Sequence, residues 1–371
     1  MLVTDAAGLK QYRKEHRIWQ GIPSIEVTKE GRVFCAFYSG ETNEKKGNFC
    51  MLVKSEDGVV FSEPIAVAYD EGYRCFDPCV WIDPLGRLWF VWAVMEKKGC
   101  FGVICDDPDA DELVWGEEFF IGHDIMLNKP IVLCTGEWIF PVAVWDKDRL
   151  ELSPLYYDTD AEPGSYAYVS RDQGKTFEIL GASHVPDRFF DEHMILEMKD
   201  GSLKMFVRAP YGIGVSESFD GGKTWTEGGD SGLGGPNSRF YIGRLKSGRI
   251  LLVNHVDFPP KQRTNLCALL SEDEGKTWKY RLMLDTRNAV SYPDAKEADD
   301  GFIYITYDRE RGQKKLSLEE VYACAREVLY CRITEEDIMA GQIVNEQSRM
   351  NCIISKLGEY DGPEPDFSWC Q

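Results

Sequence analysis

The sequence lacks the two features that would tie it to a membrane or to nucleic acid. No stretch of its 371 residues approaches the roughly 18 consecutive apolar residues of a membrane-spanning helix. No run of Lys and Arg is present either, and the formal net charge is −20. Because a protein that neutralises phosphate groups needs a basic face, we expect neither nucleic acid nor an anionic membrane surface as a partner.

Signals for secretion and for metal binding are also missing. The first residues, Met1–Asp5, turn polar at once, so no secretory signal is predicted. The 12 cysteines are scattered singly, as is typical of proteins in reducing compartments. The closest pair, Cys75 and Cys79, has no His nearby to complete a zinc site. We therefore expect a cytoplasmic protein that uses no metal and no cofactor.

What the chain does contain is a repeat of a glycine followed by an apolar run. These glycines recur at intervals of 47 to 65 residues, and they are Gly31, Gly86, Gly136, Gly201, Gly248 and Gly301. A second short apolar run precedes each of them, which indicates a strand, a tight turn and another strand. A period near 50 residues that carries strands and no helical spacing is typical of a four-stranded propeller blade.

The pattern predicts an all-β fold, a single six-bladed β-propeller over residues 1–371. With 43% apolar and 12% aromatic residues, the chain can bury a large core. Helical spacing appears mainly late, as an insertion at about 313–326 in the sixth blade and a helix that starts at Thr334. Residues 328–332 are expected to add a strand to that blade. The tail, about 342–371, is expected to pack over the outside or to close the ring.

A second repeat, out of phase with the first, has the form Ser-x-Asp-x-Gly-Lys-Thr-aromatic. It occurs at residues 170–177, 218–225 and 271–278, with a looser copy at 55–61. In such a segment the Ser and Asp side chains can bond turn amides, the Gly can take a positive φ, and the aromatic ring can pack between blades. Three near-identical octapeptides at blade spacing are not a coincidence.

These octapeptides resemble the Asp-box (bacterial neuraminidase) repeats of the sialidase superfamily. The resemblance extends from about Trp19 to Asp308 and implies a sialidase-like propeller. In that family the box is a structural element on the outer rim, and it also occurs in propellers without sialidase activity. The activity therefore has to be argued from the site residues.

Five positions match the family's active-site spacing. Glu192 leads through a strand, turn and strand to Arg208, and Arg263 stands eight residues before the Ser of the last octapeptide. The resemblance makes Tyr292 the nucleophile and Glu192 its proton acceptor. Arg208 and Arg263 would bind an anionic group, and Asp308 stands where the family usually has a Glu that steadies the arginines.

Two family positions differ. The family's opening arginine is replaced by Gly21, for which Arg17 or Arg74 is a possible substitute. The family's acid/base Asp is missing from the loop after the first hairpin. Asp77 is the first candidate for that acid, and Glu41, also assigned to substrate binding, is the next.

Three further residues are assigned to substrate binding. Trp19 could stack on a sugar ring, and Gln20 follows it in the strand that opens the first blade. His193 lies beside Glu192, and His255 also flanks the group, although a lone His is more often structural.

The expected function is a sialidase-like exo-glycoside hydrolase that removes a terminal, acidic sugar from a small oligosaccharide. A tyrosine nucleophile suits such a substrate, because a carboxylate would be repelled by the sugar's own carboxylate. Two alternatives stay open: the same fold acting on an uronic acid or neutral sugar as hydrolase or lyase, and a non-catalytic carbohydrate-binding propeller.

Overall fold

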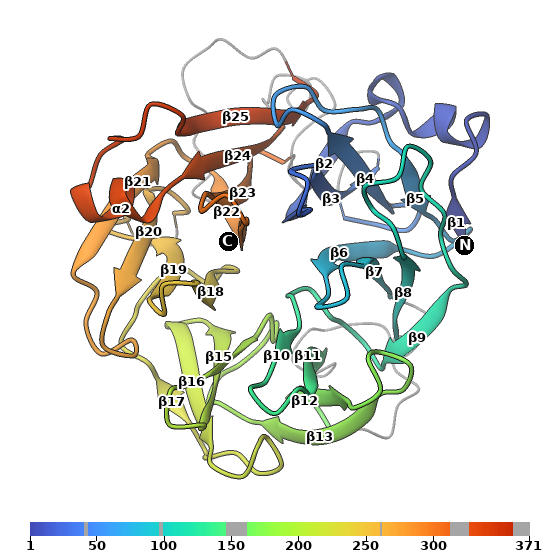
Figure 1. Cartoon of the computed structure of the whole chain (residues 1–371). Coiled ribbons are helices and arrows are strands. Elements are labelled where there is room, and N and C mark those ends of the chain that lie inside the picture. The colour runs from blue at the N-terminus through green and yellow to red at the C-terminus, as the bar shows by residue number, and fades with distance from the viewer. Residues whose placement is uncertain (41–43, 96–98, 146–161, 260–261, 312–325, 359–371) are drawn as a thin grey trace.

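Six antiparallel sheets form a ring of blades around a central axis in the computed structural model of this chain (Figure 1). The structure describes residues 1–40, 44–95, 99–145, 162–259, 262–311 and 326–358. The predicted six-bladed β-propeller is confirmed. In each blade the strands follow one another from the centre outward, and blade 1 gains an outer strand from the N-terminus.

The strands fall into the blades in chain order. Blade 1 holds β1 (Leu2–Val3), β2 (Trp19–Val27), β3 (Val33–Gly40), β4 (Phe49–Ser55) and β5 (Ala66–Ala68). Blade 2 holds β6 (Cys75–Ile82), β7 (Leu88–Val94), β8 (Gly99–Cys105) and β9 (Phe119–Gly122). Blade 3 holds β10 (Ile131–Val132), β11 (Trp138–Val144), β12 (Gly164–Ser170) and β13 (Glu178–Ser183).

The second half of the ring repeats the arrangement. Blade 4 holds β14 (Met194–Glu197), β15 (Leu203–Ala209), β16 (Gly212–Ser218) and β17 (Gly229–Asp230). Blade 5 holds β18 (Tyr241–Arg244), β19 (Ile250–His255), β20 (Leu266–Ser271) and β21 (Tyr280–Asp285). Blade 6 holds β22 (Val290–Glu297), β23 (Ile303–Arg309), β24 (Glu327–Ile333) and β25 (Arg349–Lys356).

Three short helices lie outside the sheets of the described chain. Two 3-10 helices, η1 (Gly8–Tyr12) and η2 (Lys14–His16), precede β2. The helix α2 (Glu335–Ala340) begins after Thr334, whose side chain accepts a hydrogen bond from the backbone of Asp337. This is the helix start that the sequence predicts.

The C-terminal expectations have mixed outcomes. The predicted strand at 328–332 lies within β24. Part of the expected tail forms β25, the outermost strand of blade 6, and residues 359–371 lie outside the described part of the chain. The predicted helical insertion at 313–326 also lies there, apart from Arg326.

The predicted glycine turns are confirmed in every blade. Each of the six glycines sits between the first and second strands with a positive φ between 82° and 95°. A Cβ added to any of these six glycines would meet no atom within 4 Å. Glycine is therefore required by the positive φ of the backbone and not by lack of space.

The three octapeptides fold into the same turn. Ser170 donates to Asp172 (2.9 Å), and the Asp172 carboxylate accepts from the backbone N–H of Lys175 and from both the backbone and side chain of Thr176. Asp220 and Asp273 are bound in the same way by their own Thr. These hydrogen bonds, led by those from the Thr, hold the pKa of all three carboxyls at about 2.

Buried polar contacts join the first and last blades at the centre. Asp294 of β22 accepts hydrogen bonds from the Ser24 hydroxyl (2.8 Å) and the Ile25 backbone (2.9 Å) of β2. Lys129 and Arg239, from two other blades, pair with the same carboxylate. Burial acts to raise the pKa of Asp294, but these two cations hold it below its usual value. These contacts of Asp294 hold the innermost strands of the first and last blades in place, and the site is built on those strands.

The described residues include no helix that is long and apolar enough to cross a membrane. Their cysteines are all free and, apart from Cys134 and Cys352, buried. Nor do these residues contain a group of three or more His, Cys, Asp or Glu side chains arranged to hold a metal ion.

Candidate active site

Three innermost strands carry a bulge at the same level of the ring. In β2, β6 and β22 the register shifts beside a residue that precedes a proline. These residues, Ile22, Asp77 and Tyr292, take positive φ values of 57°, 50° and 56°. A bulge re-aims the side chain that it carries, and left-handed backbone at non-glycine residues is concentrated at functional sites. Blades 2 and 6 thereby each present a titratable side chain.

Tyr292, Glu192 and Arg208 form a closed triangle of hydrogen bonds. The Tyr292 hydroxyl donates to Glu192 Oε1 (2.8 Å), and Arg208 Nη1 donates to both the same Oε1 (2.8 Å) and the Tyr292 oxygen (2.9 Å). All three side chains are buried, with exposed fractions of 4–5%. The three residues that the sequence separates by up to 100 positions therefore meet in space.

The surroundings of Tyr292 keep its phenol neutral. Burial, with a further contribution from Glu192, raises its pKa to about 12, while Arg208, Arg311 and Arg263 act in the opposite direction. Glu192 Oε1 already accepts the phenol's hydrogen, so a path for that proton exists. Glu192 Oε2 is buried and has no hydrogen-bond partner among the described residues.

Asn237 positions two of the arginines, a role that the sequence did not reveal. Its side-chain oxygen accepts from Arg208 Nε (2.7 Å), and its backbone carbonyl accepts from Arg208 Nη2 (3.0 Å) and Arg263 Nη2 (2.8 Å). The segment before Asn237 is rich in glycine, and the backbone needs it there: a Cβ at Gly235 would lie 2.7 Å from the Asn254 side chain. That glycine-rich segment is the only signal the sequence offered.

Arg263 lies beside the triangle and forms no ion pair with a carboxylate of the described residues. Its guanidinium carbon is 5.5 Å from the centre of the Tyr292 ring. Among the described residues its guanidinium donates one hydrogen bond, to the Asn237 carbonyl, and its buried Nε has no partner. Burial lowers its pKa to about 10, so it stays a cation at neutral pH.

A third arginine, Arg311, also reaches the site, and the sequence had not pointed to it. Its guanidinium carbon lies 4.4 Å from the centre of the Tyr292 ring. Its Nη1 is 3.6 Å from Asp308 Oδ2, an ion pair rather than a hydrogen bond. Asp308, fully buried, also accepts from the Ile22 backbone (2.8 Å) and the Ser291 hydroxyl (2.7 Å). Asp308 thus lies next to an arginine, as the family resemblance implied.

Asp77 interacts electrostatically with Glu192 of the triangle and with Arg74 and Glu44. Burial, with the negative charge of Glu192 second, raises the pKa of Asp77 to about 8, so its carboxyl is largely protonated at neutral pH. Arg74 donates to Glu44 (3.0 Å) and to the Tyr38 hydroxyl (3.1 Å). Arg74 is therefore already paired with a carboxylate, in contrast to Arg263.

Two of the predicted binding residues are engaged elsewhere. Arg17 donates to the side-chain oxygen of Gln20 (2.9 Å) and lies 5.7 Å from the Phe37 ring centre. Gln20 in turn donates to the backbone carbonyls of Arg326 (2.6 Å) and Ser355 (3.1 Å) in the last blade. The structure thus does not bring Arg17 or Gln20 to the Tyr292 triangle, because Arg17 contacts residues of blade 1 and Gln20 joins blade 1 to the last blade.

The aromatic and imidazole candidates are buried. Trp19 is 1% exposed and packs 4.6 Å from the Tyr38 ring, which leaves no free face for a sugar. Both ring nitrogens of His193 face backbone carbonyls, those of Asp191 (3.0 Å) and Tyr166 (2.8 Å). His255 is likewise buried against the chain, and Glu41 lies outside the described residues.

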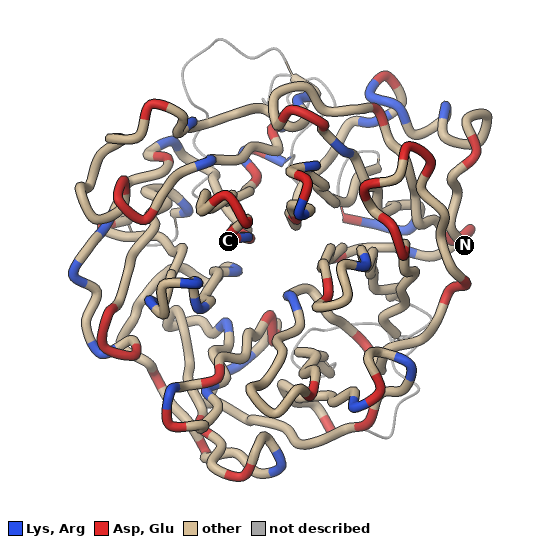
Figure 2. Tube along the Cα trace, viewed as in Figure 1, with Lys and Arg blue, Asp and Glu red and all other residues tan. Residues whose placement is uncertain are grey.

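Lys and Arg lie on the loops and strands around the centre of the ring, interspersed with Asp and Glu, in a chain of net charge −20 (Figure 2). A propeller with a tyrosine, a glutamate and arginines at this centre has the architecture of the sialidase superfamily. The family model that matches the chain, over residues 31–305, is the BNR repeat-like domain. The chain therefore belongs to this family, within that superfamily.

Comparisons with individual proteins point the same way. An anhydrosialidase from Macrobdella decora is 29% identical over an alignment of 178 positions, and the match covers 43% of this chain and 23% of that protein. The Hadza microbial sialidase Hz136 superposes with a TM-score of 0.64 at 18% identity, covering 80% of this chain and 65% of that one. An intramolecular trans-sialidase from Ruminococcus gnavus does so with a TM-score of 0.61 at 15% identity, covering 86% and 95%.

The matched region spans about a quarter of the curated relative, and the chain spans less than two thirds of the Hadza sialidase. At 15–18% identity the solved structures establish the fold. Substrate and reaction have to come from the side chains of this chain.

Proposed function

We propose that this protein is an exo-acting glycoside hydrolase of the sialidase type that removes a terminal acidic sugar. The observation that carries the proposal is the hydrogen bond from the Tyr292 hydroxyl to Glu192, with Arg208 bound to both. A nucleophile within hydrogen-bond reach of a base that a third group orients is the arrangement that covalent catalysis needs.

The first half of the reaction follows from these contacts. Tyr292 Oη attacks the anomeric carbon while Glu192 Oε1 accepts the phenol's proton. The glycosidic bond breaks, and its oxygen leaves with a proton from Asp77. A neutral phenol approaches a carbon beside the sugar's carboxylate without the repulsion that a carboxylate nucleophile would meet.

The second half restores the enzyme. Water attacks the anomeric carbon of the tyrosyl glycoside, Asp77 takes the water's proton, and Glu192 returns its proton to the Tyr292 oxygen. The sugar leaves with a hydroxyl group at the anomeric carbon. Asp77 suits the acid step because the raised pKa keeps its proton in place at neutral pH.

The anionic part of the substrate faces arginines. Arg263, a partly buried cation without a carboxylate partner in the described chain, gains most from a carboxylate ligand. This charge favours an acidic sugar over a neutral one. A non-catalytic carbohydrate-binding propeller would explain the arginines but not the proton path from Tyr292 to Glu192.

The test is to trap the intermediate on Tyr292. An acidic sugar fluoride with a second fluorine beside the anomeric carbon should attach to the protein, because that fluorine slows the second step more than the activated first step. Intact mass and peptide mapping should place the sugar on Tyr292. Tyr292→Phe should abolish labelling, and Tyr304→Phe, in the same blade, should leave it unchanged.

Product analysis separates the alternatives. Natural oligosaccharides and aryl glycosides of sialic and uronic acids should yield the free sugar, and elimination or internal ring closure would yield a product lighter by one water. Tight binding without turnover across the panel, with no label on Tyr292, would contradict the hydrolase and favour a binding propeller.

A further inference from the structure

Gly21 of β2 stands against the Arg311 side chain. A Cβ added to Gly21 would lie 2.8 Å from Arg311 Cδ, 2.9 Å from Arg311 Cβ and 2.9 Å from Asp308 Oδ2. Its φ is not positive, so the backbone conformation does not demand glycine here. Space demands it, because any side chain at position 21 would occupy the volume that Arg311 fills.

Arg311 is held in this place by both of its ends. Its backbone carbonyl accepts from the Gln20 backbone N–H (3.3 Å), which ties the end of blade 6 to the start of β2. Its guanidinium lies between Asp308, at 3.6 Å, and the Tyr292 ring, at 4.4 Å. An arginine that follows β23 thus reaches the spot beside Gly21 from the neighbouring blade.

The charges around Tyr292 leave room for one more anion. Three guanidinium groups, those of Arg208, Arg263 and Arg311, surround its ring and hydroxyl. Only two carboxylates, on Glu192 and Asp308, contact them among the described residues. Arg311 Nη1 and Arg263 Nε are also buried without a hydrogen-bond partner in that part of the chain. Buried donors and a surplus of positive charge call for an anionic acceptor.

We propose that Arg311 supplies the third arginine of a carboxylate clamp, in place of the arginine that position 21 lacks. The glycine at position 21 leaves the space that the Arg311 side chain occupies. The ligand class is a sugar that bears a carboxylate, bound by Arg208, Arg263 and Arg311 from blades 4, 5 and 6. The inference rests on the proposed function for turnover, but carboxylate binding can be measured without it.

The test is to remove the arginine at position 311 and then to place an arginine at position 21 instead. Arg311→Gly should weaken binding of N-acetylneuraminate, or of glucuronate if that is the preferred acid, by about 10- to 100-fold. It should leave binding of the corresponding carboxamide nearly unchanged, because the amide has no charge for the clamp to recognise. The double variant Gly21→Arg with Arg311→Gly should recover part of the preference for the acid.

Two further variants complete the series. Gly21→Ala should weaken acid binding by displacing Arg311, even though it changes no charge. Arg171→Gly removes a half-exposed arginine on the rim, where it pairs with Glu137 and Glu178, and should change neither affinity. Thermal melting of each variant shows whether the fold is intact, and Arg311→Lys replaces Arg311→Gly if the glycine variant unfolds.

Equal affinity of Arg311→Gly and the parent protein for the acid would overturn the inference. Equal losses for acid and carboxamide would do the same, because they would make the role of Arg311 structural. If the parent protein binds the acid but releases no product from any glycoside, the proposed hydrolase fails while the clamp is still tested by calorimetry.

Discussion

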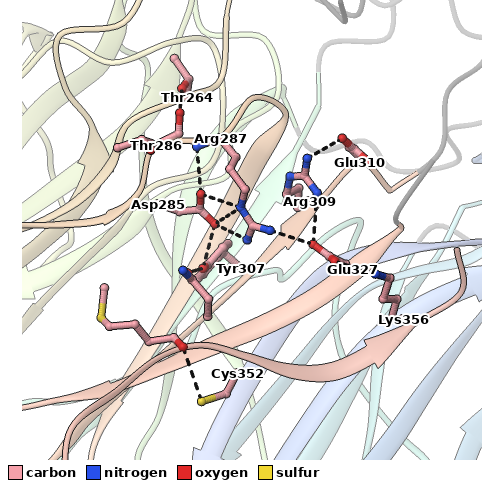
Figure 3. Close-up of polar contacts among 12 residues, drawn as sticks. Thr264, Asp285, Thr286, Arg287, Tyr307, Arg309, Glu310, Glu327, Cys352 and Lys356 are labelled. Atoms are coloured by element: carbon pink, nitrogen blue, oxygen red, sulfur yellow. Dashed lines mark hydrogen bonds and ion pairs between the residues drawn. The ribbon is translucent and has the colours of Figure 1, made fainter. Parts of the chain in front are cut away.

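Two partly buried clusters of charge differ in how their charges are balanced. At the junction of blades 5 and 6, Arg287 pairs with Asp285 (2.6 Å) and with Glu327 (3.4 Å), as Figure 3 shows. Glu327 also contacts Arg309 (3.4 Å) and Lys356 (3.6 Å). Every cation of this network, which we call the blade 5–6 network, faces a carboxylate of the chain itself.

The cluster around Tyr292 is unbalanced. Arg208 has Glu192 and Arg311 has Asp308, but Arg263 has no carboxylate partner among the described residues. A buried charge without a partner lowers stability, and a ligand of opposite charge relieves that cost. We therefore propose that the balanced network holds blades together and that the unbalanced cluster binds the substrate.

The largest effect is expected at the unbalanced cluster. Tyr292→Phe should lower turnover by about 1,000-fold or more, because it removes the attacking oxygen and leaves the Glu192–Arg208 pair in place. Stability should change little. Initial rates on aryl glycosides, with melting curves as the control, measure both. Unchanged turnover would rule out the tyrosine mechanism.

A second variant in the cluster should act through pH. Asp77→Asn should reduce turnover of unactivated glycosides by about 100-fold, and much less for aryl glycosides whose leaving group needs no proton. The parent protein should lose activity as the pH rises through about 8, where Asp77 gives up its proton. An alkaline limb that persists in Asp77→Asn would assign the acid to another residue.

The same carboxyl affects stability with a defined sign. Because folding raises the pKa of Asp77 from 3.8 to about 8, its contribution to stability is full below about pH 4 and is lost as the pH rises through 8. Asp77→Asn should therefore lose less stability than the parent between pH 5 and pH 9. Melting temperatures at both values measure the difference, and identical slopes would contradict the raised pKa.

The blade 5–6 network should respond in the opposite way. Glu327→Gln removes the carboxylate shared by Arg287, Arg309 and Lys356 and should cost about 3 kcal/mol of unfolding free energy. Turnover well below the melting temperature should be preserved. Urea unfolding measures the loss. If Glu327→Gln were as stable as the parent protein, the ion pairs of this network would not contribute to the free energy of unfolding.

The smallest change in stability is expected at Arg263. Arg263→Met removes the unpartnered cation, so stability should stay the same or rise, while affinity for an acidic sugar falls by about 10- to 100-fold. Calorimetry and melting curves on the same sample separate the two quantities. A loss of stability close to that of Glu327→Gln would mean that Arg263 is a structural residue.

The local signals in the sequence were sufficient for the fold. Glycine is one of the few residues that fits a positive φ at no cost, so glycines such as Gly86 and Gly201 mark the blade turns directly. Because the strands of the blades have similar lengths, residues at equal distances from these turns lie at similar positions in their blades. Glu192, Arg208 and Tyr292, which the resemblance to the sialidase family had selected, do meet in the structure.

The sequence missed the residues that reach the site from another blade. Arg17 is near position 21 in the sequence, yet it bonds Gln20, while Arg311 reaches position 21 from the end of β23. No periodicity encodes such an approach. Asn237 was missed for the same reason, because a loop residue's two arginine partners lie on separate blades.

The sequence by itself determined the ring, its six turns and the placing of a tyrosine, a glutamate and two arginines on successive blades, because hairpin geometry is local and repeats. Only the tertiary structure decided which charges are left unbalanced and that Arg311 fills the space beside Gly21. Packing between residues some 290 positions apart, in blades that meet only when the ring closes, sets those contacts.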